Sequence, residues 1–432
     1  MFWAEENETL DRDSLSRLQL DRLQALLARV TRDVPYYRQK LSGIAPEEVS
    51  SLAVLSELPF TTKDTLREHY PFGLLAVPLE RVVRIHASSG TTGKQTVVVY
   101  TRADMALWGE VMARTLVSGG VTSDDVVHNA YGYGLFTGGL GFGLGAETVG
   151  AATVPASSGQ TSRHLKLLED FGATVLCCTP SYALVLAETA EQEGIDLRAR
   201  LKLRVGFFGA EPWSQSIREE VETRLSVEAF DVYGLSEIIG PGVAVDCGEH
   251  QGLHINEDHF LPEVIDPETG AVLPTGRVGE LVFTTLTKEA LPLIRYRTRD
   301  RVRLTREPCA CGRAFARMSK VQGRTDDMLI VRGVNVFPSQ IEEALLGVPG
   351  IAPQYAILVD RGKDHLDDLE VWVEPTAESD RGDFSLRERA RLAQERVESI
   401  LGIRARVRLV NRGEIERSQG KAVRVIDRRE GS

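Results

Sequence analysis

Short runs of β-branched residues alternate with helix-forming stretches between Val82 and about Val175, and no other feature of the chain constrains its fold as strongly. The runs read VVRI, TVVVY, DVVHNA, ATVP and ATVLCC, and stretches such as 104–116 between them carry a helical pattern. This alternation is typical of a largely parallel sheet with helices on its faces. Residues 204–208 (RVGFF) predict a further buried strand. Because ligands bind at the carboxyl ends of strands in open α/β sheets, we expect the site there.

A segment rich in glycine and hydroxyl residues follows the first of these runs. It reads ASSGTTGK, from Ala87 to Lys94. Glycines let the backbone approach an anion closely, backbone N–H groups and hydroxyls donate hydrogen bonds, and the lysine adds positive charge. The common P-loop has four residues between its glycines and a hydroxyl residue after its lysine. Here two residues intervene and Gln95 follows. A mobile surface loop is the alternative on composition alone, but the order SSGTTGK favours a phosphate-binding loop.

Size and charge narrow the class of protein. A length of 432 residues is ample for two domains. With 51 basic and 62 acidic residues the net charge is −11, which argues against nonspecific binding to nucleic acid or an anionic membrane. The acidic start MFWAEENETLDRD is unlike a signal peptide, and five cysteines do not indicate a disulfide framework. We expect a cytoplasmic enzyme that acts on small molecules.

Motifs spread over most of the chain are similar to those of a known family. They read RIHASSGTTGK, YGYGLFTGG (131–139), GAEPW (209–213), YGLSEIIGPGV (233–243), LTKEALPLIRYRTRD (286–300), GRTDDMLIVRGVNVFPSQIE (323–342) and RSQGKAVRVIDRR (417–429). SSGTTGK resembles the phosphate-loop signature of the adenylate-forming enzymes, which include acyl-CoA synthetases, luciferases and peptide-synthetase adenylation domains. Within that superfamily the surrounding sequence is similar to that of phenylacetate–CoA ligases. Arg299 departs from the glycine that many relatives have at its position.

The resemblance implies an α/β fold in two domains. A large N-terminal adenylate-forming domain, 1–323, with mixed β-sheets and flanking helices would bind ATP and the acid. A smaller mobile α+β domain, 324–432, would carry the catalytic lysine and turn about a hinge at Asp326. The patterns of LEVWVEP, 386–401 and ARVRLV independently indicate a βαβ-like arrangement in this part. Glu280–Phe283 and Leu293–Tyr296 predict strands of a smaller β layer in the large domain.

The site residues are likewise carried over by resemblance. The catalytic residues would be Lys421, Glu237 and Thr92, and Glu237 would hold Mg²⁺, since this hard cation prefers a carboxylate. Alone, Glu237 reads as a surface acid and Lys421 as a solvated lysine. Arg332 and Gly333 would face coenzyme A. The residues implied for nucleotide binding are Ser88, Ser89, Gly90, Thr91, Thr92, Gly93, Lys94, Gly209, Ala210, Glu211, Asp231, Tyr233, Gly234, Ser236, Asp300 and Arg324.

The activity implied is ATP-dependent ligation of an aryl acid, with phenylacetate favoured, to coenzyme A through an acyl adenylate. Its partners would be ATP, Mg²⁺, the acid, coenzyme A and a second copy of the chain in a homodimer. Two alternatives remain open: an adenylating enzyme for benzoate-type acids that loads coenzyme A or a carrier protein, and an acyl-adenylate sensor without turnover.

The segment YGYGLFTGGLGFGLG combines aromatic rings with glycines, which suits a pocket for a flat aromatic acid. A packed turn with core rings is the alternative. The residues we expect around the acid are Tyr131, Phe136, Ala210, Ile239 and Pro241.

A separate set of residues has the composition of a structural zinc site. Cys247 and His254 are separated by six residues, and Cys309 and Cys311 by one. Three thiolates and one imidazole make a complete tetrahedral set for Zn²⁺ without an open position. The alternative is a group of unrelated reduced cysteines and a histidine.

Overall fold

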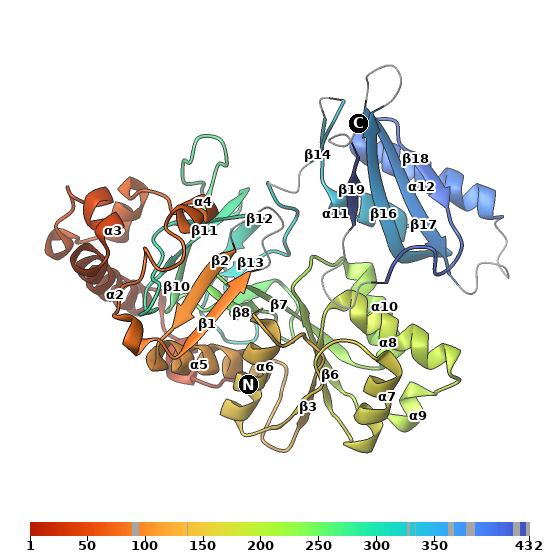
Figure 1. Cartoon of the computed structure of the whole chain (residues 1–432), viewed down its shortest axis with the longest axis horizontal. Coiled ribbons are helices and arrows are strands. Elements are labelled where there is room, and N and C mark those ends of the chain that lie inside the picture. The colour runs from red at the N-terminus through yellow and green to blue at the C-terminus, as the bar shows by residue number, and fades with distance from the viewer. Residues whose placement is uncertain are drawn as a thin grey trace. The chain divides into compact units, whose positions relative to one another are not determined.

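The computed structural model describes residues 1–88, 95–135, 137–325, 329–332, 334–361, 367–376, 385–417 and 424–428. The chain forms two compact units (Figure 1). The first comprises Met1–Cys178, Arg198–Ala210 and Val227–Val321; the second comprises Thr179–Leu197, Glu211–Ser226 and Gln322–Ser432. The domain boundary expected at 323/324 stays a prediction.

The first unit contains an eleven-stranded mixed sheet in the order β10-β11-β12-β13-β9-β8-β7-β6-β5-β3-β4. Five strands at one end run parallel, as the alternating pattern predicts. They are β3 (Val126–Asn129), β4 (Ala152–Pro155), β5 (Val175–Cys178), β6 (Val205–Gly209) and β7 (Glu228–Leu235). The others are β8 (Ile239–Val245), β9 (Leu253–Ile255), β10 (Phe260–Ile265), β11 (Val278–Thr285), β12 (Tyr296–Thr305) and β13 (Arg317–Met318).

Two strand expectations were wrong. The runs VVRI and TVVVY do not join the parallel sheet; β1 (Arg84–Ser88) and β2 (Thr96–Tyr100) pair antiparallel in a sheet of their own. The chain between them is too short for the crossover of a dozen or more residues that parallel strands need. The predicted smaller β layer belongs to the eleven-stranded sheet, and its second strand starts only at Tyr296 because Arg295 has a left-handed φ of 45°.

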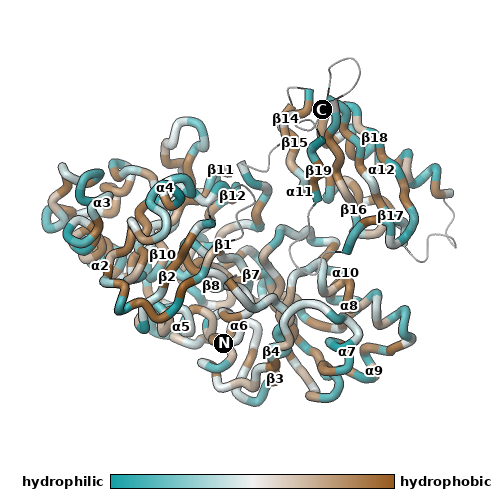
Figure 2. The backbone as a smooth tube through the Cα atoms, in the orientation of Figure 1, coloured by the Kyte–Doolittle hydropathy of each residue, from teal (hydrophilic) through white to brown (hydrophobic). Residues whose placement is uncertain are grey.

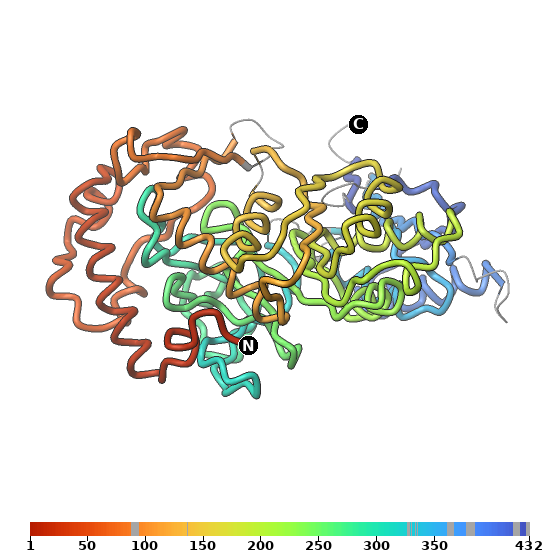
Figure 3. Tube along the Cα trace, turned by 90° about the horizontal axis from the view of Figure 1, so that it is seen from below, coloured from red at the N-terminus to blue at the C-terminus, as the bar shows by residue number. Residues whose placement is uncertain are grey.

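The helices of the first unit form an N-terminal layer and also pack on its sheet. The leucine stripe of α2 packs inward, with Leu23, Leu27 and Val30 fully buried, and Asp11 caps the helix. Figure 3 shows this red N-terminal layer at one side of the unit. The helices are α1 (Glu5–Glu8), α2 (Arg12–Asp33), α3 (Pro35–Lys40), α4 (Lys63–Glu68), α5 (Arg102–Ser118), α6 (Gly138–Val149), α7 (Thr161–Asp170) and, spanning the unit boundary, α9 (Leu197–Arg200), with short 3₁₀ turns at Pro46–Glu48, Leu52–Glu57 and Leu79–Arg81.

Helix α6 is formed by the glycine-rich segment itself, which the sequence did not predict. A Cβ on Gly145 would lie 2.6 Å from Met112 Cβ of α5, and one on Gly141 would lie 2.8 Å from Trp108. The glycines therefore permit two helices to approach closely, and this contact outweighs the poor helix propensity of glycine.

The second unit contains a four-stranded sheet in the order β18-β17-β16-β19. β17, α12 and β18 form the predicted βαβ arrangement, since β17 and β18 pair parallel. Helix α12 alternates hydrophobic and hydrophilic residues in Figure 2 and buries Ala393, Val397 and Leu401. The elements are α8 (Pro180–Gln192), α10 (Gln215–Leu225), β14 (Leu329–Val331), β15 (Val334–Val336), α11 (Pro338–Leu346), β16 (Ile351–Arg361), β17 (Asp367–Pro375), α12 (Leu386–Leu401), β18 (Arg406–Leu409) and β19 (Val425–Asp427). None of the helices in the described part of the chain is long and apolar enough to cross a membrane.

Candidate functional site

Tyr233 and Asp300, which come from distant parts of the sequence, meet in the first unit. Tyr233 lies near the end of β7 and Asp300 on β12. The Tyr233 hydroxyl donates a hydrogen bond to Asp300 Oδ2 at 2.5 Å, and Asp300 is almost completely buried. The short bond to a carboxylate is charge-assisted and fixes the orientation of that carboxylate. One oxygen of Asp300 is thereby committed to Tyr233.

The next residues of the same motif are also buried. Ser236 Oγ lies 3.2 Å from Thr137 Oγ1, so the YGLSE motif contacts the start of α6. Glu237 is 6% exposed, and Lys63 Nζ lies 3.9 Å from its Oε1. Asp231, further back on β7, is buried as well. Glu237 thus offers a carboxylate near the surface of the unit with a half-exposed lysine beside it, which is compatible with binding a divalent cation.

Close approach of the backbone requires glycine at two predicted nucleotide-binding positions. Gly209 ends β6 and pairs with Val232; a Cβ there would lie 2.2 Å from the Val232 carbonyl oxygen. Gly234 lies where the β7–β8 register shifts, and its Cβ would lie 2.8 Å from Pro241 Cα. Such irregularities in a ladder often lie next to active sites.

Two other residues at this end of the sheet have left-handed backbone conformations. Ala210 follows β6 with φ 70°, and Arg299 precedes Asp300 with φ 69°. Non-glycine residues in this region cost about 1–3 kcal/mol each, and such strain gathers at functional sites. Glycine would adopt the conformation of Arg299 without strain.

Three of the predicted residues, Glu211, Arg324 and Arg332, lie in the second unit. Glu211 accepts a hydrogen bond from the Ser181 backbone N–H at 2.8 Å and another from the Ser181 hydroxyl. Arg324 is half-buried. Arg332 donates to the Asp367 carbonyl oxygen at 2.7 Å and pairs with Asp368 at 3.0 Å.

Several predicted residues lie outside the described part of the chain. Ser88 ends β1, and nothing is described of its side chain. The residues outside are Ser89, Gly90, Thr91, Thr92, Gly93, Lys94, Phe136, Asp326, Gly333 and Lys421. Their roles stay predictions.

Of the described residues predicted to surround the acid, Tyr131 and Ile239 are buried, Pro241 is partly buried and Ala210 is exposed. Tyr131 is 5% exposed and stacks on Phe142 with ring centroids 5.0 Å apart. Ile239 is fully buried at the start of β8, and the Pro241 carbonyl oxygen accepts a hydrogen bond from Trp108 Nε1 at 2.9 Å. The described residues therefore bring these side chains to the same sheet end, and the pocket itself stays a prediction.

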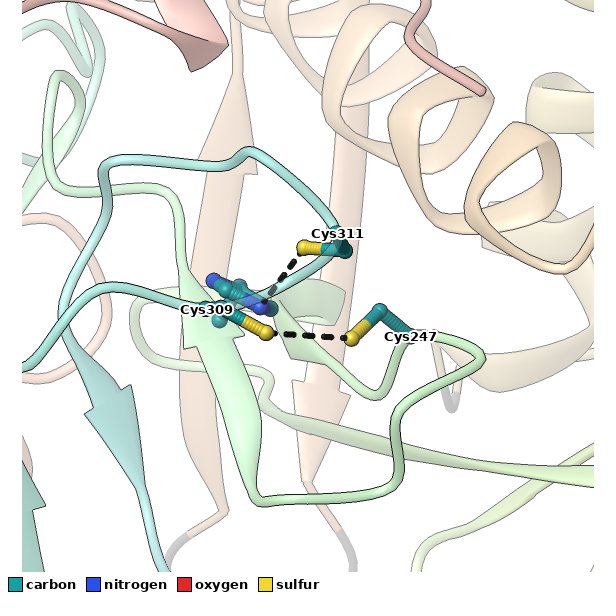
Figure 4. Close-up of side chains that lie close together, drawn as sticks. Cys247, Cys309 and Cys311 are labelled. Carbon is teal, nitrogen blue, oxygen red and sulfur yellow. Dashed lines mark hydrogen bonds between the residues drawn. The ribbon is translucent and has the colours of Figure 1, made fainter.

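Cys247, His254, Cys309 and Cys311 converge in the first unit, with their ligand atoms all within 4.8 Å of one another (Figure 4). The sulfurs of Cys247 and Cys309 lie 3.8 Å apart, and Cys311 Sγ lies 3.4 Å from His254 Nε2. His254 Nδ1 lies 3.3 Å from the Phe315 carbonyl oxygen, which makes Nδ1 the donor and leaves the Nε2 lone pair toward the thiols. Hydrogen bonds with Cys247 and His254 lower the pKa of the Cys311 thiol.

Comparison with known proteins identifies the family. The family model described as AMP-binding enzyme matches residues 24–286, which is more than half of the chain. The chain belongs to the AMP-binding enzyme family. A second model, AMP-binding enzyme C-terminal domain, matches residues 333–429.

Relatives of this AMP-binding enzyme match over nearly its whole length. It is 49% identical to a phenylacetate-coenzyme A ligase of Thermus thermophilus, covering 99% of this chain and 100% of the relative, and 48% identical to one of Escherichia coli, covering 98% and 97%. A 2-hydroxyisobutyryl-CoA ligase solved in the postadenylation state with 2-HIB-AMP is 30% identical, with a TM-score of 0.92 over 99% of this chain and 93% of that chain. The expected adenylate-forming fold is confirmed.

Sequence reasoning missed three residues that surround the Glu237 segment of this AMP-binding enzyme. They are Lys63, Trp108 and Lys288. Lys288 is fully buried, and burial lowers its pKa to about 8 against the opposing charges of Asp104 and Glu237. The signal in the sequence that could have indicated a buried lysine is the place of Lys288 among the apolar residues of TTLTKEALPLI (284–294). Its contacts with a segment fifty residues earlier could not be read from the sequence.

Proposed function

We propose that the chain ligates an aryl acid, with phenylacetate preferred, to coenzyme A at the expense of ATP, through an acyl adenylate and with release of AMP and pyrophosphate. Near-half identity over full length to proteins named phenylacetate-coenzyme A ligases supports the reaction and the acid. The observation that carries the proposal is the 2.5 Å bond between Tyr233 and Asp300, because it joins two motifs, 67 residues apart, that the family resemblance assigns to one nucleotide.

In the first half-reaction the acid's carboxylate attacks the α-phosphate of ATP and pyrophosphate leaves; in the second the thiol of coenzyme A attacks the acyl carbon and AMP leaves. Adenylation turns a carboxylate oxygen into a good leaving group. Catalysis of this kind depends on positioning and on neutralising charge, so no nucleophilic side chain is needed.

The chain's own residues then have distinct tasks. Asp300 accepts hydrogen bonds from the ribose hydroxyls, and the Tyr233 hydroxyl holds its carboxylate in place. Residues 88–94 donate to the phosphates, with Thr92 among the catalytic donors. Lys421 neutralises charge between the acid and the α-phosphate. Gly209, Ala210 and Glu211 lie against adenine, and Arg324 contacts the ribose. Arg332 and Gly333 face coenzyme A after rotation about Asp326.

Glu237 is the residue that would hold Mg²⁺. Its buried carboxylate is the oxygen ligand that this cation prefers, and Lys63 is its one ion-pair partner among the described residues. Bound Mg²⁺ would neutralise charge on the phosphates of ATP.

The Cys/His set supports a structural Zn²⁺. Tetrahedral ligands with Zn–S of about 2.3 Å and Zn–N of about 2.0 Å lie about 3.5–3.8 Å apart. Two of the observed separations, 3.8 Å and 3.4 Å, are close to this spacing, and all four ligand atoms lie within 4.8 Å of one another. The metal would tie the loop after β8 to the loop before β13. Metal analysis of protein purified without chelator should give about one zinc per chain; a metal-free, fully folded protein would remove this part of the proposal.

A substrate panel with ATP and coenzyme A tests the function. The solved relative is named for an aliphatic hydroxy acid, and this name makes such acids the alternative class to test. Preference for benzoate or for 2-hydroxyisobutyrate would reassign the acid, and transfer only to a carrier protein would reassign the acceptor. Undetectable pyrophosphate release with every acid tried would leave an acyl-adenylate sensor without turnover.

Two further parts of the proposal concern the state of the protein. A homodimer is supported by the prevalence of symmetric dimers among soluble enzymes, and light scattering tests it. A cytoplasmic location is supported by the reduced cysteines, because such thiols persist in a reducing compartment. Fractionation of cells that produce the protein tests the location.

A further inference from the structure

Lys288 contacts the backbone of the segment that carries Glu237. It lies in the loop between β11 and β12 and is fully buried. Its Nζ donates hydrogen bonds to the carbonyl oxygens of Glu237, at 3.1 Å, and Ile238, at 2.9 Å. Two successive carbonyl groups are therefore oriented by one ammonium group, directly behind the predicted Mg²⁺ ligand.

Lys288 is itself fixed from the other side of the loop. Asp104, in the first turn of α5, accepts hydrogen bonds from the backbone N–H groups of Glu289, at 2.6 Å, and Ala290, at 2.9 Å. Arg29 donates to the Lys288 carbonyl oxygen at 2.6 Å. The N-terminal end of α5 therefore fixes the position of the lysine, because Asp104 also belongs to the capping box at that end.

Aromatic rings complete the surroundings of the ammonium. Its Nζ lies 4.9 Å from the centre of the Tyr100 ring, and Tyr100 stacks on Trp108 with centroids 5.1 Å apart. Trp108 Nε1 donates to the Pro241 carbonyl oxygen, three residues beyond Ile238. The segment 237–241 is therefore held at one end by Lys288 and at the other by Trp108.

Packing alone does not explain a lysine at this position. Among the ion pairs of the described residues none includes Lys288; its ammonium contacts carbonyl dipoles and a ring face, and the Asp104 and Glu237 carboxylates act on its charge without forming an ion pair with it. Burial of an ammonium without a paired carboxylate is costly, and an apolar side chain would fill the same space without that cost. What the ammonium adds is a donor for each of two carbonyl groups.

We propose that Lys288 is a positioning residue for cation binding: by fixing the Glu237 and Ile238 peptide groups it aims the Glu237 carboxylate at the metal that accompanies ATP. The inference rests on the proposed role of Glu237. Partners that orient a metal ligand typically change metal affinity by about 10- to 100-fold when they are removed.

The test uses Mn²⁺ as a paramagnetic substitute for Mg²⁺. Binding of Mn²⁺ to the full chain in the presence of a non-hydrolysable ATP analogue is measured from the electron paramagnetic resonance signal of free Mn²⁺. Lys288→Met should raise the Mn²⁺ dissociation constant by about 10- to 100-fold, while the analogue's affinity without metal stays within about twofold of the wild type. Trp108→Phe is the matched control: it loses a donor in the same cluster, but that donor holds Pro241, four residues from Glu237, so Mn²⁺ binding should weaken far less than in Lys288→Met.

The outcomes separate this inference from the function on which it rests. Unchanged Mn²⁺ binding in Glu237→Gln would refute the role of Glu237 itself. Weakened binding in Glu237→Gln together with wild-type binding in folded Lys288→Met would overturn the positioning role. Equal weakening in Trp108→Phe would overturn it too, because it would indicate general loosening. If Lys288→Met does not fold, Lys288→Gln should show an intermediate loss, because it keeps an amide NH2 group but on a shorter side chain without charge. Wild-type affinity in that variant would overturn the inference.

Discussion

Replacing Tyr233 by phenylalanine should weaken the use of ATP while leaving the fold intact. The change removes one hydroxyl, which donates to the buried carboxylate of Asp300 at 2.5 Å. A hydrogen bond to a charged group contributes about 1.5–3 kcal/mol. If that energy fixes Asp300 for the ribose, kcat/KM for ATP should fall roughly 10- to 150-fold, since each 1.4 kcal/mol is about a factor of ten. Initial rates of pyrophosphate release at varied ATP measure it.

A similar bond elsewhere in the chain provides the control. Tyr355 donates to Glu342 Oε2 at 2.8 Å, and both residues are buried in the second unit. Tyr355→Phe also removes a hydroxyl from a carboxylate, so it should lower stability without a selective effect on ATP. A Tyr233→Phe enzyme with wild-type kcat/KM for ATP, or a Tyr355→Phe enzyme with an equal ATP defect, would refute the reasoning.

Three further predictions test other parts of the account. Gly209→Ala should cost about 1–3 kcal/mol of unfolding free energy in urea, because its Cβ would lie 2.2 Å from the Val232 carbonyl oxygen, whereas Gly43→Ala, with no atom within 4 Å, should be nearly neutral; equal effects would contradict this. Lys421→Ala should slow adenylation by roughly 10²–10³-fold and spare thioester formation from supplied acyl adenylate, and Asp326→Pro should do the reverse; equal loss in both half-reactions would refute domain alternation. Cys309→Ser should lower both the zinc content and the thermal midpoint, and an unchanged midpoint in zinc-loaded protein would exclude a structural role.

The features that sequence predicted well are those specified by local pattern. The span of α12 and the parallel strands from β3 to β6 follow from hydrophobic periodicity and were confirmed. The convergence of the Cys/His set was also predictable from residue type. The pairing of β13 with β9, which sets Arg317 opposite His254, then brings the loop of Cys309 to the imidazole.

The features that sequence did not predict depend on contacts between distant segments. Helix α6 forms because Gly145 allows contact with Met112, although its glycines locally disfavour a helix. The β1–β2 pair and the start of β12 depend on connection length and on one left-handed residue, Arg295. Lys288 is similar, since only the tertiary fold reveals that it contacts Glu237.

The most direct test of the central claim is isotope exchange between pyrophosphate and ATP, run with phenylacetate, acetate or hexanoate and without coenzyme A. We expect exchange that requires an acid, that is fastest with phenylacetate, and that gives way to phenylacetyl thioester and AMP when coenzyme A is added. Exchange of equal rate with the short aliphatic acids would contradict the aryl preference, and the absence of exchange with every acid would contradict the acyl-adenylate mechanism itself.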